Sequence, residues 1–194
     1  VILSDGVGGF LAQVRYSAGD GPVTIAVADL NKDTHPDLAV SAGLDDTLQI
    51  LLGDGTGAFV VQSPIVIDNI RQVVAGDFNG DSIPDLAAPR SSASLIDVLI
   101  GAGDGTFSPP MSFPAPFGSS YLALGDLDAN GTLDLVAVPR VVSVPPTDAA
   151  LGVLLGAGDG TFAPFTAYTI GQRPNTCVIA DVNADEVVDI RDLE

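Results

Sequence analysis

The sequence predicts an all-β fold made of repeated four-stranded antiparallel units, and three observations support this prediction. The 194 residues include 22 Gly and 14 Pro but only two Glu and one Lys, so turn formers are abundant and the usual residues of surface helices are scarce. Hydrophobic residues make up 46% of the chain, enough for a substantial core. Two short motifs also recur at a period of about fifty residues, which indicates repeated structural units.

The two motifs alternate along the chain, so each period contains two fixed turns. The first is rich in Asp and Asn and reads DLNKDTHPDLAV from Asp29, DFNGDSIPDLAA from Asp77, DLDANGTLDLVA from Asp126 and DVNADEVVDIRD from Asp181. The second reads SDGVGGF from Ser4, GDGTGAF from Gly53, and GDGTF from both Gly103 and Gly158.

Apolar stretches of strand length separate these turns. In the first period they are TIAVA (24–28), DLAVSA (37–42), TLQILLG (47–53) and FVVQSPIVI (59–67). Four strands in a period of about fifty residues indicate the blade of a β-propeller. Residues 1–194 are therefore predicted to form a single propeller domain or a segment of one, with repeats that begin near residues 23, 71, 120 and 175. About three full blades would be flanked by partial blades at both ends.

Asp or Asn occupies positions 1, 3, 5 and 9 of all four Asp-rich loops, a spacing that predicts calcium binding. Alternate side-chain oxygens in a tight loop converge, and with the carbonyl at position 7 and water they can supply the about six to eight oxygen ligands that Ca²⁺ takes. Asx turns on solvated loops are the alternative, which four copies of one spacing disfavour. Three to four calcium ions are expected, held by Asp29, Asn31, Asp33, His35 and Asp37; by Asp77, Asn79, Asp81, Ile83 and Asp85; by Asp126, Asp128, Asn130, Thr132 and Asp134; and by Asp181, Asn183, Asp185, Val187 and Asp189.

The charge balance limits the possible partners. Seven Lys and Arg against 25 Asp and Glu give a formal net charge of −18, which repels the phosphates of nucleic acids and anionic lipids. No apolar run approaches the ~20 residues of a membrane-spanning helix. Nucleic acid binding and membrane insertion are therefore not expected. A single cysteine, Cys177, excludes an internal disulfide framework.

Together, these residues resemble the FG-GAP/VCBS repeat family, which includes the calcium-binding blades of integrin α-subunit propellers and of many bacterial surface and secreted proteins. DFNGDSIPDLAA and GDGTF are close to motifs of that family. The resemblance covers nearly the whole chain and implies structural calcium in the loop between the first two strands of each blade. It also implies an extracellular location, either secreted or on the cell surface. Thr34, Ser82 and Glu186 stand where the family prefers Gly.

The fourth loop is open to a second interpretation. It is also similar to a dockerin or EF-hand half-site, because Asp192 stands at position 12 of the loop. The strand-like TCVIA before it aligns with the earlier repeats, which favours a propeller loop.

The leading functional interpretation is a calcium-stabilised extracellular binding or adhesion module without enzymatic activity. Its ligand would be a glycan or a protein, bound by variable connections opposite the Asp-rich loops. By register this face carries Arg90, Arg140, Tyr121 and Arg173. The chain has one His, inside a predicted metal loop, and no GxSxG or HExxH motif, so no catalytic set is evident.

Two further functions are left open. The chain could be a non-catalytic or catalytic part of a secreted polysaccharide-degrading enzyme. It could also be a structural subunit of an extracellular assembly or filament, in which partial blades pair between chains, since contacts that do not close into a ring generate fibres.

Overall fold

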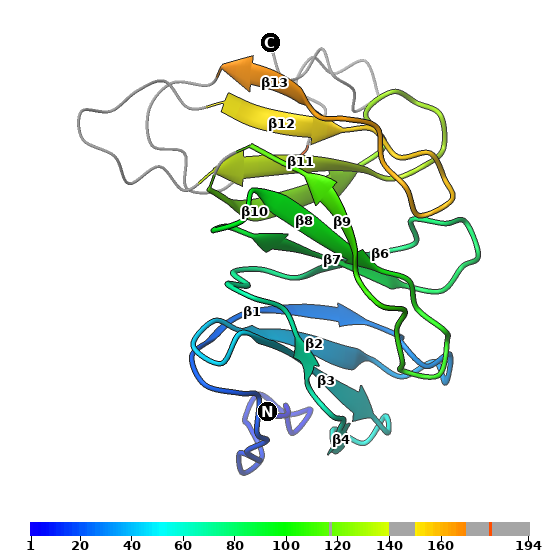
Figure 1. The fold of residues 1–194 in the computed structure, drawn as a ribbon. Coiled ribbons are helices and arrows are strands. Elements are labelled where there is room, and N and C mark those ends of the chain that lie inside the picture. The colour runs from blue at the N-terminus through cyan, green and yellow to red at the C-terminus, as the bar shows by residue number, and fades with distance from the viewer. Residues whose placement is uncertain (117, 140–149, 170–178, 180–194) are drawn as a thin grey trace.

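The computed structural model describes residues 1–116, 118–139, 150–169 and 179. These residues form thirteen β-strands, arranged in three antiparallel sheets that stack in chain order (Figure 1). The predicted all-β fold of four-stranded antiparallel blades is therefore confirmed. None of the described residues belongs to a helix long and apolar enough to cross a membrane.

Strands pair in chain order within each sheet, except that β4 and β5 of the first sheet both pair with β3, and we call the three sheets blades 1, 2 and 3. Blade 1 contains β1 (Pro22–Ala28), β2 (Asp37–Ala42), β3 (Thr47–Gly53), β4 (Phe59–Val61) and β5 (Ile65–Val66). Blade 2 contains β6 (Val74–Gly76), β7 (Asp85–Arg90), β8 (Leu95–Leu99) and β9 (Met111–Pro114). Blade 3 contains β10 (Ser119–Gly125), β11 (Asp134–Pro139), β12 (Ala150–Leu154) and β13 (Thr166–Thr169).

The outer strand of blade 1 is interrupted, whereas the sequence predicts one strand over residues 59–67. β4 and β5 both pair with β3, at its end and at its start respectively. Pro64 lies between them and has no N–H to donate to a neighbouring strand. The side chain of the buried Gln49 bridges the gap, because its Nε2 donates to the carbonyl of Gln62 at 2.5 Å.

The hydrophobic core lies between the blades. One cluster joins blades 1 and 2 and includes Leu30, Ile50 and Leu86; the next joins blades 2 and 3 and includes Phe78 and Leu135. Because each sheet buries its apolar residues against a neighbouring sheet, the stacking of blades is the main source of hydrophobic stabilisation.

In each blade a buried aspartate links the Asp-rich loop to the end of the third strand. Asp37, Asp85 and Asp134 begin the second strands and are 0% exposed. Each accepts two backbone N–H bonds, one from the apolar residue at position 2 of its own loop and one from the glycine that follows or ends the third strand. The donors are Leu30 (2.8 Å) and Gly53 (2.7 Å) for Asp37, Phe78 and Gly101 (both 2.8 Å) for Asp85, and Leu127 (2.7 Å) and Gly156 (2.8 Å) for Asp134.

A backbone bond between neighbouring blades fixes the same edge. The N–H of Gly105, in the second turn of blade 2, donates to the carbonyl of Leu30 in blade 1 at 3.1 Å. Gly160 of blade 3 donates in the same way to Phe78 of blade 2 at 2.9 Å. Position 2 of each of these loops therefore contributes a buried side chain, an N–H bond within its blade and a carbonyl bond to the next blade.

Replacing the buried aspartate of blade 2 should destabilise the protein even without metal. In Asp85→Asn one buried N–H, of Gly101 or Phe78, faces an amide group that cannot accept its hydrogen bond, which costs about 1–3 kcal/mol. The repulsion from Asp77 and Asp81 that the substitution relieves is smaller, because those carboxylates lie nearer the solvent and are screened. We expect thermal unfolding in excess chelator to shift down by several degrees, whereas Asp20→Asn, at an exposed aspartate, leaves it unchanged. Equal melting temperatures for Asp85→Asn and the original chain would show that the hydrogen bonds of Asp85 do not stabilise the blade.

Candidate metal centre

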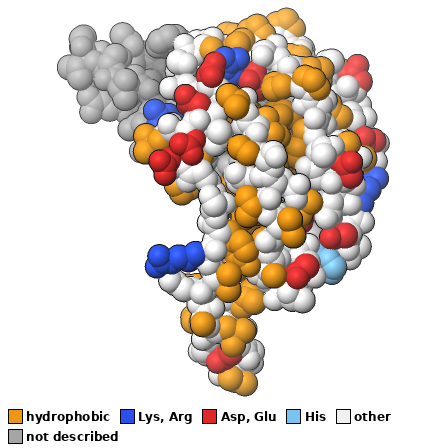
Figure 2. Space-filling model, turned by 60° about the horizontal axis from the view of Figure 1, so that its bottom comes forward, with side chains coloured by type: hydrophobic (Ala, Val, Ile, Leu, Met, Phe, Trp, Pro, Cys, Tyr) orange, Lys and Arg blue, Asp and Glu red, His pale blue; other side chains and the backbone are white. Residues whose placement is uncertain are grey.

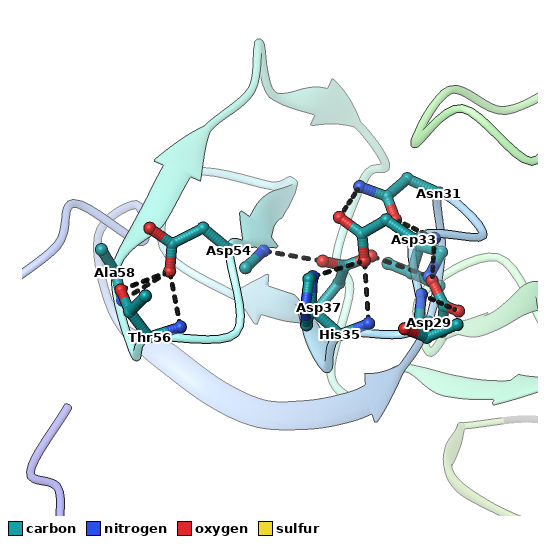
Figure 3. Close-up of polar contacts among 11 residues, drawn as sticks. Asp29, Asn31, Asp33, His35, Asp37, Asp54, Thr56 and Ala58 are labelled. Carbon is teal, nitrogen blue, oxygen red and sulfur yellow. Dashed lines mark hydrogen bonds and ion pairs between the residues drawn. The ribbon is translucent and has the colours of Figure 1, made fainter.

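Each described Asp-rich loop folds around its own acidic side chains. In the first loop the carboxylate of Asp29 accepts the N–H groups of Asp33 (3.1 Å) and Thr34 (2.8 Å), and Asp33 accepts the N–H of His35 at 2.8 Å (Figure 3). Asp77 and Asp126 accept the equivalent bonds in the second and third loops. In each of the three described repeats, hydrogen bonds from the backbone to the carboxylate at position 1 thus order the loop that carries the predicted ligands.

The loop requires left-handed backbone conformations at positions 4 and 6. Lys32 and Thr34 have φ values of 62° and 70°, and Ser82 has 62°. Glycine adopts such angles without a steric penalty, which explains why glycine is favoured there. Non-glycine residues at these positions carry strain, and the side-chain bonds from position 1 hold them in place.

The third loop brings three carboxylates together. Oxygen atoms of Asp126, Asp128 and Asp134 all lie within 4.8 Å of one another, and this is the only such cluster of acidic, His or Cys side chains in the described part of the chain. Asp134 is buried, Asp126 is half-buried and Asp128 is exposed, so the cluster is open to solvent on one side. An all-oxygen donor set fits a hard cation, so these residues could hold a metal ion.

The first two loops differ from the third in the placement of charge. Their acids stand at positions 1, 5 and 9, with Asn31 and Asn79 at position 3, whereas the third loop has Asp128 at position 3 and Asn130 at position 5. The amide of Asn31 donates to Asp33 at 2.9 Å, and that of Asn79 donates to Asp81 at 3.0 Å. Each loop still contains three carboxylates and one amide.

The electrostatics at position 9 favour a bound cation. Burial raises the pKa of Asp85 and of Asp134, and carboxylates at the other loop positions raise it further, although the two donated N–H bonds act in the opposite direction. Asp33 differs, because the N–H of His35 and the amide of Asn31 lower its pKa. A positive ion at the centre of the loop would offset the repulsion that raises the pKa of the buried acids.

The second turn of each blade packs directly against the Asp-rich loop. The ring of His35 lies against Gly55, where an added Cβ would meet it at 2.3 Å, and Nδ1 of His35 is 3.3 Å from Oδ1 of Asp33. Ile83 and Thr132 contact Gly103 and Gly158 in the same way. A side chain at position 7 therefore covers the neighbouring turn, while its carbonyl is the predicted ligand.

The structure changes the alignment of the second motif. Gly53 and Phe59 enclose the turn in blade 1, and the isolated bridges Gly101–Phe107 and Gly156–Phe162 enclose the corresponding turns. The equivalent sequences are thus GDGTGAF and GAGDGTF, so Asp104 and Asp159 sit two positions later in the turn than Asp54. The GDG triplets are therefore not equivalent, although all three aspartates accept hydrogen bonds from the threonine two residues later.

The described residues of the predicted ligand face are engaged in the scaffold. Arg90 ends β7, its Nη2 donates to Asp68 at 3.1 Å, and its Nη1 lies 3.7 Å from the buried carboxylate of Asp97. Tyr121 packs beside the hydrophobic cluster of blade 3. Several predicted site residues lie outside the described residues, namely Arg140, Arg173, Asp181, Asn183, Asp185, Val187 and Asp189.

Comparisons with known proteins identify the repeat. A family model described as an FG-GAP-like repeat matches residues 35–88, from the first Asp-rich loop into β7, which confirms the resemblance for this part of the chain. Among solved structures, the chain is similar to a chain of the Photorhabdus luminescens Tc holotoxin pore, with 20% identity and a TM-score of 0.48. That similarity covers 78% of this chain and 7% of that one. A search of curated protein sequences gave no match.

Removing the exposed carboxylate of the third loop should weaken metal binding without harming the metal-free fold. In Asp128→Asn the amide oxygen can still accept the N–H of Asn130, which lies 3.2 Å from Asp128 Oδ1, so only the charge is lost. We expect isothermal titration calorimetry to show at least about tenfold weaker calcium binding at one site. Asp104→Asn is the matched control and should leave all calcium binding unchanged. Unaltered binding in Asp128→Asn would remove Asp128 from the ligand set.

The threonine in the second turn should control the pKa of its aspartate. The hydroxyl of Thr106 donates to Asp104 at 2.6 Å and lowers the pKa of Asp104, together with the N–H of the same residue. A lowered pKa contributes stability above about pH 3.8, and this contribution is lost as the pH falls through the folded-state pKa. In Thr106→Val, NMR titration should show the pKa of Asp104 closer to its ordinary value while that of Asp159 is unaffected. An unchanged Asp104 titration would mean that the hydroxyl does not set this pKa.

Proposed function

We propose that the protein is a non-enzymatic, calcium-stabilised binding module that acts outside the cell, as a secreted or cell-surface protein. The observation that carries this proposal is the convergence of Asp126, Asp128 and Asp134 within a loop that the chain repeats. The FG-GAP-like repeat over residues 35–88 supports the same proposal, because it contains part of the first loop and all of the second.

Calcium fits the donor set better than magnesium does. Magnesium requires near-ideal octahedral geometry and keeps several waters, whereas calcium accepts six to eight oxygens in flexible arrangements. In the third loop Asp126, Asp128, Asn130, Asp134 and the carbonyl of Thr132 would hold the ion. The bound ion would neutralise carboxylates that repel one another and would join both ends of the loop, which stabilises the folded state over the unfolded one.

The proposed ligand is an extracellular glycan or protein that binds opposite the Asp-rich loops. Local bonds hold the connections of blade 1 on this face: Asp46 accepts the N–H of Asn69 at 2.7 Å, and Asp45 accepts the N–H of Asp20 at 2.6 Å. A rigid scaffold that presents variable connections is a frequent arrangement for binding. Arginines on this face, Arg140 and Arg173 by register, would provide charged contacts in a protein of net charge −18.

Capture by immobilised acidic polysaccharides tests this proposal. The calcium-loaded protein should bind at least one polyuronate or sulfated glycan, and Arg140→Ala with Arg173→Ala should weaken capture about tenfold or more. Lys32→Ala, which removes one positive charge from the Asp-rich loop face, is the control and should leave capture unchanged. Equal losses in both variants, or failure to bind any probe, would contradict the proposed ligand face.

Calcium dependence is tested separately in the same samples. Excess chelator should lower the melting temperature and abolish capture, and added calcium should restore both. An unchanged melting temperature would contradict the role of calcium, whatever the capture assay gives.

A further inference from the structure

The second turn of a blade contacts two Asp-rich loops, one in its own blade and one in the preceding blade. We call the Asp-rich loops of blades 1 to 3 loops 1, 2 and 3 (residues 29–37, 77–85 and 126–134), and the second turns of blades 2 and 3 turns 2 and 3 (residues 101–107 and 156–162). These loops and turns lie along one edge of the stack, on the right in Figure 1, and acidic side chains line the same edge in Figure 2. Turns 2 and 3 therefore each lie between two predicted calcium sites.

Loop 3 holds turn 3 through the residues at its positions 7 and 9. The hydroxyl of Thr132 donates to the carbonyl of Gly156 at 3.0 Å, and Asp134 accepts the N–H of Gly156 at 2.8 Å. The methyl group of Thr132 also lies against Gly158, where an added Cβ would meet it at 2.8 Å. Asp134 and the carbonyl of Thr132 are predicted calcium ligands. The two residues that position turn 3 are therefore the ones that ligand bonds in loop 3 would fix.

The same turn contacts loop 2 at positions 2 and 4 of that loop. The N–H of Gly160 donates to the carbonyl of Phe78 at 2.9 Å. The rings of Phe78 and Phe162 meet edge to face, with their centroids 5.6 Å apart. The carbonyl of Gly158 lies 3.7 Å from the place of an added Cβ at Gly80. Because positions 2 and 4 lie between the predicted ligands at positions 1, 3 and 5, turn 3 supports the backbone of the second predicted calcium site.

Turn 2 repeats this arrangement between loops 1 and 2. The N–H of Gly105 donates to the carbonyl of Leu30, at position 2 of loop 1, at 3.1 Å. Gly103 lies between the two loops, because an added Cβ there would be 3.3 Å from Cδ of Lys32 in loop 1 and 3.2 Å from Cδ1 of Ile83 in loop 2. In the described part of the chain, a continuous series of contacts therefore runs from loop 1 to loop 3 through both turns.

We propose that calcium binding at neighbouring Asp-rich loops is positively coupled through the turn that they share. The inference rests on the proposed function, because it requires calcium in these loops. Ligand bonds at positions 7 and 9 of an occupied loop hold the shared turn in the place where it also contacts the neighbouring loop. The neighbouring loop then spends more time in its binding geometry, which raises its apparent calcium affinity. By linkage, each of the two loops raises the affinity of the other by the same factor.

Electrostatic interaction between the loops acts with the opposite sign, which makes the coupling measurable. Loop 3 carries the carboxylates of Asp126, Asp128 and Asp134. An empty loop 3 in Asp128→Asn keeps two of these charges and is still more negative than the original loop with bound Ca²⁺. Charge alone therefore predicts that emptying loop 3 strengthens calcium binding at loop 2, to an extent that salt reduces. Coupling through turn 3 predicts that emptying loop 3 weakens calcium binding at loop 2.

A calcium titration of the original chain and of Asp128→Asn tests the proposal. The NMR signals of the Gly80 and Gly131 amides report the occupancy of loops 2 and 3 separately, in competition with a calcium chelator. We expect calcium affinity at loop 2 to fall about fivefold in Asp128→Asn, at the low end for coupled sites because hydrogen bonds already order both loops. Unchanged or stronger binding at loop 2 overturns the coupling and leaves the proposed function in place. If neither loop of the original chain binds calcium, the proposed function fails and the coupling fails with it.

Two glycine variants locate the coupling in turn 3. Gly160 has a φ of 83°, and an added Cβ would meet Cδ1 of Ile100 at 2.7 Å, so Gly160→Ala displaces turn 3 from loop 2. In this background Asp128→Asn should no longer weaken calcium binding at loop 2. Gly105→Ala is the matched control, because Gly105 has the same φ and its Cβ would meet Cδ1 of Leu52 at 2.8 Å, but turn 2 joins loops 1 and 2. There Asp128→Asn should still weaken binding at loop 2 about fivefold. Coupling that persists in Gly160→Ala, or that is lost in both backgrounds, overturns the assignment to turn 3, and the titration of Asp128→Asn alone does not depend on either glycine variant folding.

Discussion

The buried carboxylate at position 9 is the interaction on which the rest of the structure depends. Asp37, Asp85 and Asp134 each join the Asp-rich loop to the end of the third strand through two backbone N–H bonds. A buried charge is tolerated only when hydrogen bonds or an opposite charge compensate it. Two N–H bonds compensate part of it at Asp85 and Asp134, where burial raises the pKa and these bonds lower it. A bound cation would supply the missing compensation, and folding and metal binding would then be linked at the same carboxylate.

Stacking of the blades then joins the individual sheets into one structure. The apolar residue at position 2 is buried between sheets, and its carbonyl receives an N–H from the next blade at Leu30 and at Phe78. In the described part of the chain the core clusters join neighbouring blades, as in other repeat proteins, where stability is approximately a sum of unit and interface contributions. The effect of stacking is clear at one position of the first strands, where Val73 and Leu122 lie between blades and are 3% and 4% exposed.

The sequence predicts the sheets well because the repeated turns fix where strands begin and end. It predicts the interruption of the outer strand at Pro64 less well, since the buried Gln49 that bridges the gap is distant in sequence. The alignment of the GDG triplets is wrong because their aspartate occurs at two different positions of the turn. Gly101 and Gly156, which begin the turns of blades 2 and 3, are the sequence signal that would have shown this shift of two residues. The spacing predicts the aspartates at position 9 as metal ligands, but their role as acceptors for Gly53, Gly101 and Gly156 can be seen only in the fold.

Hydrogen bonds within the described Asp-rich loops order the backbone in the absence of a cation. The carboxylate at position 1 accepts two N–H groups of its own loop. These bonds maintain positive φ angles at Lys32, Thr34 and Ser82, each of which costs about 1 kcal/mol or more. Because the backbone is already ordered, little conformational entropy remains to be lost when an ion binds, and preorganisation of this kind favours affinity. Oxygens that accept one N–H retain a second lone pair, so the same carboxylate can hold the loop and a metal ion at once. The strained residues and the clustered carboxylates are therefore two parts of one arrangement, in which the loop geometry gathers negative charge at a point where a bound cation would offset it.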